Sequence, residues 1–321
     1  MNKDKSLVTV IMSVYNENSK FLNAAISSIL NQTYNNLEFI IINDGSTEEL
    51  TIKTIADWEN KDSRVRVLSQ PNRGLTKSLN IALQNANGNF ICRQDSDDWS
   101  DLTRIDKQIH FLRSNLEIGL VGSQALLHQE NGTALWDTKL PTDPTEITKY
   151  LEQNGNPFIH GSVCFRKDLS INIGMYREEL KFGQDYDFFY RLCEITKGAN
   201  LQKSLYNYRY TASAAPKSAS YHNTTSLTQI LAKLRKETGA DSYDDALGIL
   251  TESRPESPSN LPQLSFADRL MLAGSYRQSA VQYIRAILNS PFDRISWLKF
   301  CRFLIFLLFP VFRAKLYRNK F

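Results

Sequence analysis

The first third of the chain alternates short apolar runs with amphipathic stretches, and this alternation constrains the fold more than any other feature. Residues 7–14, 37–42 and 64–68 are rich in Val, Ile and Leu, whereas residues 20–30 and 48–60 carry apolar side chains at helical spacing. The runs VTVIMSV and EFIIIN are nearly all apolar, as expected of strands buried on both sheet faces. The pattern predicts an α/β fold: a mainly parallel central sheet with helices on both faces.

Polar side chains gather where the predicted strands end. In doubly wound sheets, ligands bind beyond the carboxyl ends of the strands, so these residues are the first candidates for function. A fourth apolar run, 90–93, leads directly into the acidic segment 94–98. The candidates that follow the four runs are Ser13, Tyr15, Glu17, Asp44, Arg73, Asp95, Ser96 and Asp97. We therefore expect four strand ends to line one crevice.

Bulk composition excludes several classes of protein. With 42% hydrophobic and 22% charged residues, the chain is neither disordered, collagen-like nor a many-helix membrane transporter. A net charge of +4 is too small to indicate nucleic-acid binding. The four cysteines are scattered and contain no C-x-x-C pair, so neither a zinc site nor a disulfide framework is expected. The polar residues 1–6 leave no room for a signal peptide, and we expect a cytoplasmic protein.

Later segments predict a second part of the chain. At 321 residues the sequence exceeds one ordinary domain. Residues 241–264 are rich in Ser, Pro, Asp and Glu, and three prolines fall within 254–263, so this segment is predicted to be a linker. We therefore expect a catalytic domain over 1–240 and a helical C-terminal extension over 265–321.

Four motifs occur in order with the spacing of a βαβ succession. They are SVYNE at 13–17, NDGS at 43–46, QPNRG at 70–74 and DSDD at 95–98. Together, over about residues 7–209, they resemble the family 2 inverting glycosyltransferases of the GT-A fold. The resemblance implies a Rossmann-like domain that transfers a sugar, with inversion, from a nucleotide-sugar to a glycan or lipid-linked acceptor. It also implies a role in cell-envelope polysaccharide synthesis.

Part of this set suits a nucleotide donor. A uracil ring presents a flat π face and an N3–H donor, so Tyr15 can stack on it while the Asp44 carboxylate accepts that hydrogen bond. Asp44-Gly45-Ser46 also reads as a turn followed by a helix cap. Arg73 either binds the diphosphate or is a solvated charge. The resemblance adds Ser13, Glu17, Asp95 and Ser96 to the donor-binding residues.

The acidic segment 95–98 predicts a divalent-cation site. Three carboxylates this close repel one another, and a cation or a hydrogen-bond network must compensate the repulsion. Oxygen ligands suit Mg²⁺ or Mn²⁺, which can bridge carboxylates to phosphate oxygens. The resemblance assigns Asp95 to ribose and metal and Asp97 to the metal, whereas Asp98 is predicted to cap the next helix. The competing interpretation is a solvated acidic turn.

Inverting transfer needs a carboxylate that deprotonates the acceptor hydroxyl opposite the leaving group. Asp185 is the predicted base, with Asp187 as the fallback and a helix N-cap as the structural alternative for Asp185. Gln184 stands where the family usually has Glu, and it can hydrogen-bond an acceptor but cannot act as a base. His160 matches a frequent histidine of the family, either as an acceptor or metal contact or as a structural residue.

Residues 297–321 combine an aromatic row with basic side chains. Trp297, Phe300, Phe303, Phe306, Phe309 and Phe312 alternate with lysines and arginines, and the longest uncharged run, 303–312, is too short to span a bilayer. The pattern predicts an interfacial helix that binds the inner face of the plasma membrane peripherally. The alternative is packing on the catalytic domain or on another subunit.

Two other functions fit parts of the sequence. A sugar nucleotidyltransferase would share the sheet and the metal, but it needs a Gly-rich basic loop after the first strand, where this chain has Tyr15-Asn16-Glu17. A catalytically silent nucleotide-sugar-binding protein is favoured only by Gln184.

Overall fold

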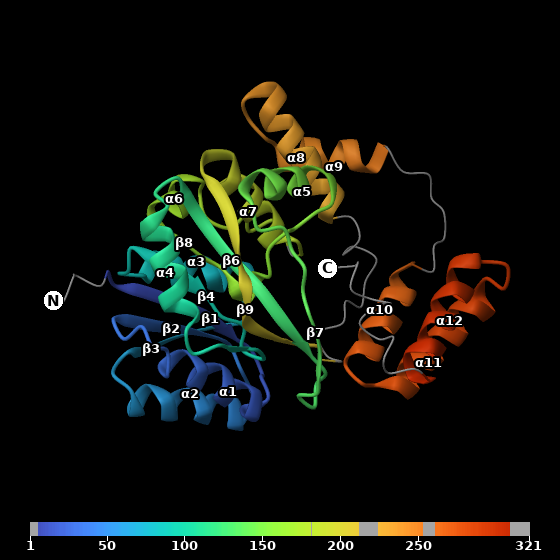
Figure 1. Cartoon of the computed structure of the whole chain (residues 1–321), viewed down its shortest axis with the longest axis horizontal. Helices are drawn as coiled ribbons and strands as arrows, with labels where there is room; N and C mark the ends of the chain where they lie inside the picture. The colour runs from blue at the N-terminus through green and yellow to red at the C-terminus, as the bar shows by residue number, and fades with distance from the viewer. Residues whose placement is uncertain (1–5, 181, 212–223, 253–260, 309–321) are drawn as a thin grey trace. The chain divides into compact units, whose positions relative to one another are not determined.

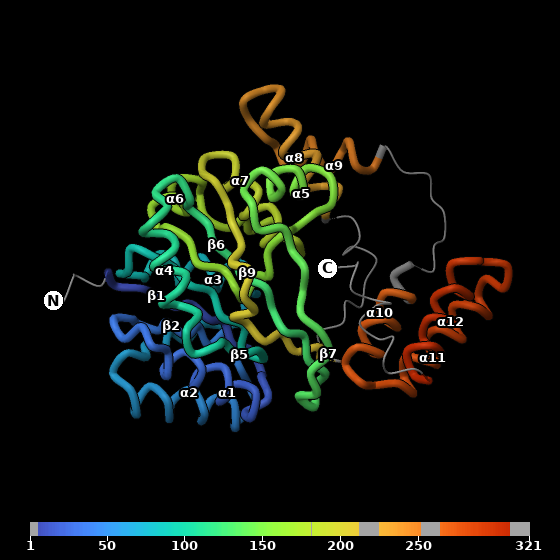
Figure 2. The backbone as a smooth tube through the Cα atoms, viewed as in Figure 1, coloured from blue at the N-terminus to red at the C-terminus, as the bar shows by residue number. Residues whose placement is uncertain are grey.

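The computed structural model describes residues 6–180, 182–211, 224–252 and 261–308 (Figures 1 and 2). The chain divides into two compact units. The first comprises residues 1–125 and 140–207, and the second comprises residues 126–139 and 208–321. Phe309, Phe312 and the basic residues after them lie outside the described residues.

The first unit contains the predicted parallel strands. Their order is β3 (Val65–Gln70), β2 (Leu37–Asp44), β1 (Val8–Val14) and β4 (Phe90–Arg93), and each neighbouring pair is parallel. The crossovers are α1 (Ser19–Leu30), α2 (Glu49–Lys61) and α3 (Leu75–Asn85). As expected, the carboxyl ends of β1, β2 and β4 lie side by side at one edge of the sheet.

Antiparallel strands extend the sheet beyond β4. β8 (Cys164–Arg166) pairs antiparallel with both β4 and β6 (Ile118–His128), and β5 (Trp99–Ser100) pairs antiparallel with β9 (Lys197–Arg209). The remaining helices of this unit are α4 (Arg104–Ser114), α5 (Pro144–Gln153), the 3₁₀ turn η1 (His160–Ser162), α6 (Lys167–Asn172) and α7 (Gln184–Ile195). The sheet is therefore mixed, with its parallel part at the predicted site.

Apolar side chains cover both sheet faces. On one face, Val10 packs with Ile26 of α1 and Ile109 of α4. On the other, Ile11 packs with Leu79 of α3 and Phe188 of α7. Neighbouring residues of one strand thus enter opposite cores, which is why the strand runs are uninterrupted rather than alternating. The predicted α/β class with helices on both faces is confirmed.

The second unit is mostly helical. Its described residues contain the hairpin strand β7 (Ala134–Asp137), which pairs with the end of β6, and the helices α8 (Thr224–Thr238), α9 (Tyr243–Glu252), α10 (Leu261–Leu272), α11 (Tyr276–Asn289) and α12 (Arg294–Leu308). The predicted linker 241–264 includes α9 and the first turn of α10. Ala246 and Leu250 of α9 are buried and lie one helical turn apart. This helical spacing was visible in the sequence, but the linker prediction gave more weight to the prolines later in the segment.

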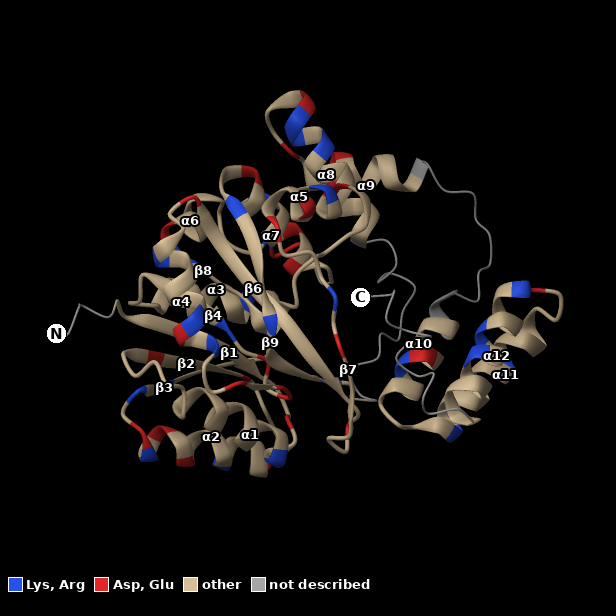
Figure 3. Ribbon diagram, viewed as in Figure 1, with Lys and Arg blue, Asp and Glu red and all other residues tan. Residues whose placement is uncertain are grey.

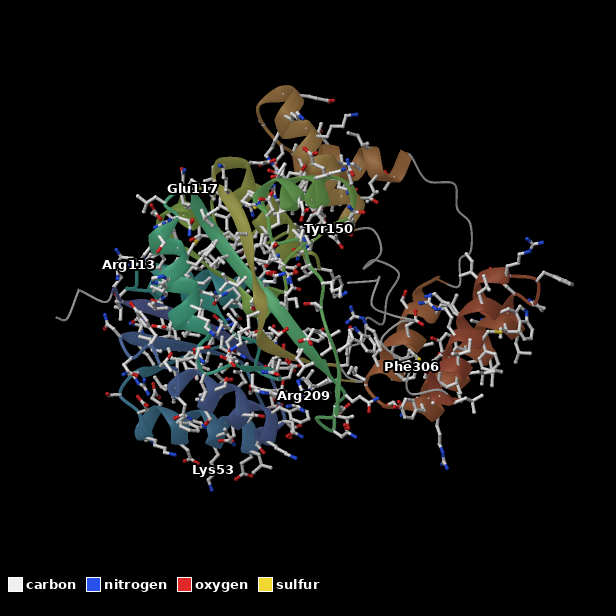
Figure 4. The ribbon with its side chains drawn as sticks, viewed as in Figure 1. Lys53, Arg113, Glu117, Tyr150, Arg209 and Phe306 are labelled. Atoms are coloured by element: carbon white, nitrogen blue, oxygen red, sulfur yellow. The ribbon has the colours of Figure 1, made fainter. Side chains whose placement is uncertain are left out.

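The structure corrects the prediction for the aromatic row. Phe303 and Phe306 are buried against Tyr283 and Ala286 of α11, and Figure 4 marks Phe306 on α12. These two rings therefore form core contacts and cannot face a lipid surface. The helix is apolar on several sides, so its sequence did not indicate which side packs inward. Among the described helices, none combines the length and the hydropathy needed to cross a bilayer.

Candidate active site

The loops after β1 and β2 are tied together at the sheet edge. Asn16 donates its backbone N–H to Ser46 Oγ at 3.1 Å, and its Oδ1 accepts from the backbone N–H of Thr47 at 2.7 Å and of Glu48 at 3.0 Å. Asn16 has a left-handed backbone conformation, φ 47°, which Asn tolerates better than most residues. The SVYNE and NDGS motifs are thereby fixed as one platform.

Asp44 organises the loop after β3. Its carboxylate is 2% exposed and accepts three hydrogen bonds, from Gln70 Nε2 at 2.7 Å, the Arg73 N–H at 2.8 Å and the Gly74 N–H at 2.9 Å. Gly45 follows with φ 74°, and a Cβ there would lie 2.5 Å from the Asn72 nitrogen. The chain therefore turns at Gly45 as the turn interpretation predicts, but the motif does not cap α2, which begins at Glu49 with Glu48 as its N-cap residue. A carboxylate with about four lone-pair sites still has one acceptor position left.

Two predicted donor contacts are open to solvent. The Tyr15 side chain is 53% exposed, and the Arg73 side chain is exposed although its backbone is fixed by Asp44. Ser13, at the end of β1, is partly buried. A large exposed aromatic ring suits a planar base, and an exposed guanidinium on a fixed loop suits a diphosphate.

Glu17 joins the acidic segment from a different loop. Ser96 Oγ donates to Glu17 Oε2 at 3.0 Å, so the loop after β1 and the loop after β4 meet here. Burial and the negative charges of Asp95 and Glu17 raise the pKa of Asp97 from 3.8 to about 7. The crowding that the sequence predicted is therefore present, and it involves Glu17 as well as the aspartates.

These residues fit a hard divalent cation. Carboxylate oxygens are the ligands that Mg²⁺ and Mn²⁺ prefer, and a cation would relieve the repulsion at Asp97. In the part of the chain that the structure describes, no group of three or more His, Cys, Asp or Glu side chains stands ready to hold a metal. Asp95 and Asp97 are the residues that would hold such a cation.

Asp98 does not cap the next helix. The DSDD segment continues into β5, and α4 begins only at Arg104, with Thr103 as its N-cap residue. Asp101 instead accepts from the backbone N–H of Thr103 at 2.9 Å. The prediction for Asp98 was wrong because a two-residue strand, too short to show a pattern, separates the acidic segment from the helix.

Asp185 lies in the first turn of α7, which is acidic (Figure 3). The N-cap residue is Gly183, with φ 69°, so the N-cap interpretation of Asp185 is wrong. Asp185 Oδ2 accepts from Asn156 Nδ2 at 2.8 Å. Burial raises the pKa of Asp185, and the backbone N–H groups of the helix start offset part of that rise. A partly buried carboxyl with a raised pKa has the properties of a general base.

The Asp187 carboxylate is held by two arginines. It is fully buried, its Oδ2 accepts from Arg191 Nη2 at 2.7 Å, and its Oδ1 lies 3.7 Å from Arg177 Nε. Gln184 is 8% exposed, and its Oε1 has no hydrogen-bond partner within the described residues. Within the described residues, the Asp185 carboxylate forms no ion pair of this kind.

His160 packs as a neutral ring. Its Nε2 lies 3.0 Å from the Tyr176 hydroxyl, and it makes edge-to-face contacts with the rings of Tyr176 and Phe189. Burial and the positive charge of Arg93 lower the pKa of His160 well below 6.5. A lowered pKa favours the neutral ring, which carries no positive charge to attract a phosphate. The surroundings of His160 therefore resemble those of a structural residue packed among aromatic rings.

Three residues at the site were missed from the sequence: Arg93, Asn156 and Tyr206. Arg93 ends the buried strand β4 and forms an ion pair with Asp95. A charged residue in an otherwise apolar run such as FICR was a usable signal, because buried arginines are almost always paired. Asn156 and Tyr206 gave no comparable signal.

Comparisons with known proteins agree with this geometry. The model of the family described as glycosyl transferase family 2 matches residues 9–174, just over half of the chain. O-antigen biosynthesis glycosyltransferase WbnJ of Escherichia coli is 32% identical over 216 residues, covering 66% of this chain and 83% of that protein. Amylovoran biosynthesis glycosyltransferase AmsE of Erwinia amylovora is 32% identical over 191 residues, covering 59% of this chain and 70% of that protein.

An uncharacterized glycosyltransferase of Haemophilus influenzae is 30% identical over 220 residues, covering 63% of this chain. The match spans 65% of that protein, less than two thirds of its length.

Solved structures share the fold. The mannosyltransferase PcManGT of Pyrobaculum calidifontis, in complex with GDP-Man and Mn²⁺, superposes with a TM-score of 0.53 at 15% identity, covering 97% of this chain and 86% of that one. S. aureus TarS 1–349 in complex with UDP-GlcNAc superposes with a TM-score of 0.55 at 18% identity, covering 84% and 91%. At these identities the likeness shows the fold alone, and it confirms the GT-A architecture.

Proposed function

Because the chain belongs to glycosyl transferase family 2, we propose that it transfers a sugar from a nucleotide-sugar, a UDP-sugar in the first instance, to an envelope glycan or lipid-linked acceptor with inversion and with the help of Mn²⁺ or Mg²⁺. One observation carries the proposal: the hydrogen bond from Ser96 Oγ to Glu17 Oε2 at 3.0 Å joins the loop after β1 to the acidic segment that contains Asp95 and Asp97. Burial and the charges of Asp95 and Glu17 accordingly raise the pKa of Asp97 to about 7. Relatives in O-antigen and amylovoran biosynthesis support the acceptor class.

The donor would lie along the ends of β1, β2 and β4. Tyr15 stacks on the base, and the remaining acceptor position of Asp44 takes the uracil N3–H. Arg73 binds the diphosphate, with Ser13, Glu17 and Ser96 shaping the same edge. Asp95 and Asp97 hold the divalent cation, which when bound would neutralise charge on the leaving diphosphate.

Asp185 would deprotonate the acceptor hydroxyl. It belongs to α7, an element separate from the acidic loop, and Asn156 fixes its carboxylate. Asp187, the fallback candidate, is less suited to this role because its carboxylate forms ion pairs with Arg191 and Arg177. Gln184, whose Oε1 has no hydrogen-bond partner among the described residues, would accept a hydrogen bond from the acceptor.

The test of this function is a panel of nucleotide-sugars scored for binding and turnover with Mn²⁺ and with EDTA. We expect binding only with the cation, and we expect Asp97→Ala to lose both donor binding and turnover. Full activity in EDTA would contradict the proposal. Donor binding without transfer to any acceptor or to water would instead favour the silent binding protein, to which the replacement of Glu by Gln184 points.

We also propose that the second unit contacts the cytoplasmic face of the membrane. On α12, Leu298 is 65% exposed and Leu308 is 70% exposed, and on α11 Leu288 is 72% exposed. Arg294, exposed at the start of α12, suits anionic headgroups, whereas Lys299 pairs with Asp268 at 2.7 Å within the second unit. Figure 3 shows the basic residues of α12 in blue.

Point substitutions test this contact better than a truncation, because removal of α12 would also strip Phe303 and Phe306 from the core of the second unit. Leu298→Glu should reduce sedimentation with vesicles that contain anionic lipid. Gln278→Glu, which adds the same charge at an exposed position of α11, is the control. Equal sedimentation of both variants and the wild type would contradict the membrane contact.

A further inference from the structure

Asp95 is held from two sides by side chains of separate strands. Arg93, the last residue of β4, is 2% exposed, and its Nη1 forms an ion pair with Asp95 Oδ1. Tyr206 of β9, 1% exposed, donates its hydroxyl to Asp95 Oδ2 at 3.4 Å. The same hydroxyl accepts from the backbone N–H of Asp95 at 3.2 Å. Both carboxylate oxygens and the backbone of Asp95 are therefore fixed.

This arrangement is not needed for stability alone. Burying a guanidinium costs several kcal/mol in desolvation, roughly cancelling the attraction to its partner, and well-packed apolar residues often serve a fold equally well. Arg93 Nε, moreover, has no hydrogen-bond partner within the described residues. The retained buried charge therefore points to a function in which the position of the Asp95 carboxylate matters.

Neighbouring residues keep the two side chains in place. The Arg104 guanidinium lies over the Tyr206 ring, 5.5 Å from its centroid, and Arg104 Nη1 donates to the Arg93 carbonyl at 3.0 Å. A Cβ on Gly161 would overlap the Tyr206 hydroxyl and lie 2.5 Å from Asp95 Oδ2. Only glycine fits at this position of η1, so the backbone of η1 packs closely against the Tyr206 hydroxyl and the Asp95 carboxylate.

We propose that Arg93 and Tyr206 form a clamp that orients the Asp95 carboxylate toward the divalent cation and the donor ribose, and that both are positioning residues. The inference rests on the proposed function, because Asp95 belongs to the proposed metal and donor site. The Asp95 side chain remains 27% exposed, and its two oxygens have about four lone-pair sites, so two remain for ligands.

Conservative variants separate this role from a purely structural one. Arg93→Lys keeps the charge but loses the planar fork of donors, and Tyr206→Phe removes a single oxygen atom. Arg191→Lys is the matched control, because Arg191 forms the same kind of buried ion pair, with Asp187, away from the acidic loop. Mn²⁺ binding is measured from the electron paramagnetic resonance of the free ion, with UDP in excess, and urea unfolding is measured in parallel.

Loss of an outer-sphere partner of a metal ligand typically weakens metal binding about 10–100-fold. We expect that loss in Arg93→Lys and in Tyr206→Phe, and no such loss in Arg191→Lys, even where the three variants lose similar stability. If Arg93→Lys does not fold, Tyr206→Phe decides the question alone.

The clamp is overturned if the clamp variants bind Mn²⁺ as tightly as the wild type. Wild-type protein that binds no Mn²⁺ is a different result: it refutes the metal part of the proposed function and the clamp with it.

Discussion

Asp97→Asn should stabilise the metal-free protein. Burial and the charges of Asp95 and Glu17 raise the pKa of Asp97 from 3.8 to about 7. Because the folded state has the higher pKa, the folded chain retains a proton that the unfolded chain releases, and stability falls as pH rises from 3.8 to about 7. The asparagine variant has no charge to bury and escapes this loss.

The structure sets the size of the effect. One pKa unit corresponds to about 1.4 kcal/mol, so above pH 7 the ionised Asp97 lowers the free energy of unfolding by at most about 4 kcal/mol. Water entry and local relaxation weaken the repulsion, and we expect a measured gain of about 1–3 kcal/mol in the variant. Well below pH 4 the gain should vanish, because Asp97 is then protonated in both states.

Urea unfolding in EDTA at several pH values measures the gain, and Asp57→Asn, at an exposed position of α2, is the control. Saturating Mn²⁺ should reverse the order, because the cation binds the folded wild type and stabilises it while the variant lacks a ligand. The reasoning is refuted if the variant is no more stable than the wild type in EDTA above pH 7, or if its gain is independent of pH.

Four further results are expected. Asp185→Asn should bind donor normally but turn over about 10²–10⁴-fold more slowly, whereas near-normal turnover together with an inactive Asp187→Asn would reverse the assignment. Since burial raises the pKa of Asp185 and a base must be ionised, the acidic limb of kcat/KM should lie above the usual carboxyl range, which a pH–rate profile checks. UDP should raise the melting temperature and ADP should not, and equal protection would contradict base recognition by Tyr15 and Asp44. Gly161→Ala should raise the Mn²⁺ concentration required for turnover, because its methyl group displaces the Tyr206 hydroxyl; an unchanged requirement would show that the site relaxes around it.

The parallel half of the sheet was predictable because its signals are local. A nearly all-apolar run such as Val8–Val14 is most stable as a strand that is buried on both faces of a sheet. Residues that follow such strands in βαβ units necessarily share one edge, so the convergence of the motifs at 13–17, 43–46 and 95–98 followed from topology. Glu17 beside Ser96 is the direct outcome.

Other parts of the site depend on contacts between distant segments, which the sequence does not reveal. Tyr206 meets Asp95 across 111 residues, and Asn156 meets Asp185 across 29. The prediction for α12 was incomplete for a different reason. A helix that is apolar on several sides has more than one face that can pack, and only the contact with α11 determines that Phe303 and Phe306 are the buried residues.

The two aspartates of the acidic loop differ in what balances their charge. Asp95 is balanced within the protein by the ion pair with Arg93. The charge of Arg93 also lowers the pKa of Asp97, but less than burial, Asp95 and Glu17 raise it. Under the proposed function a bound cation would supply the positive charge that Asp97 lacks, and cation binding and folding would be linked at Asp97. The Asp95 carboxylate would keep its position when the cation leaves, because Arg93 holds it.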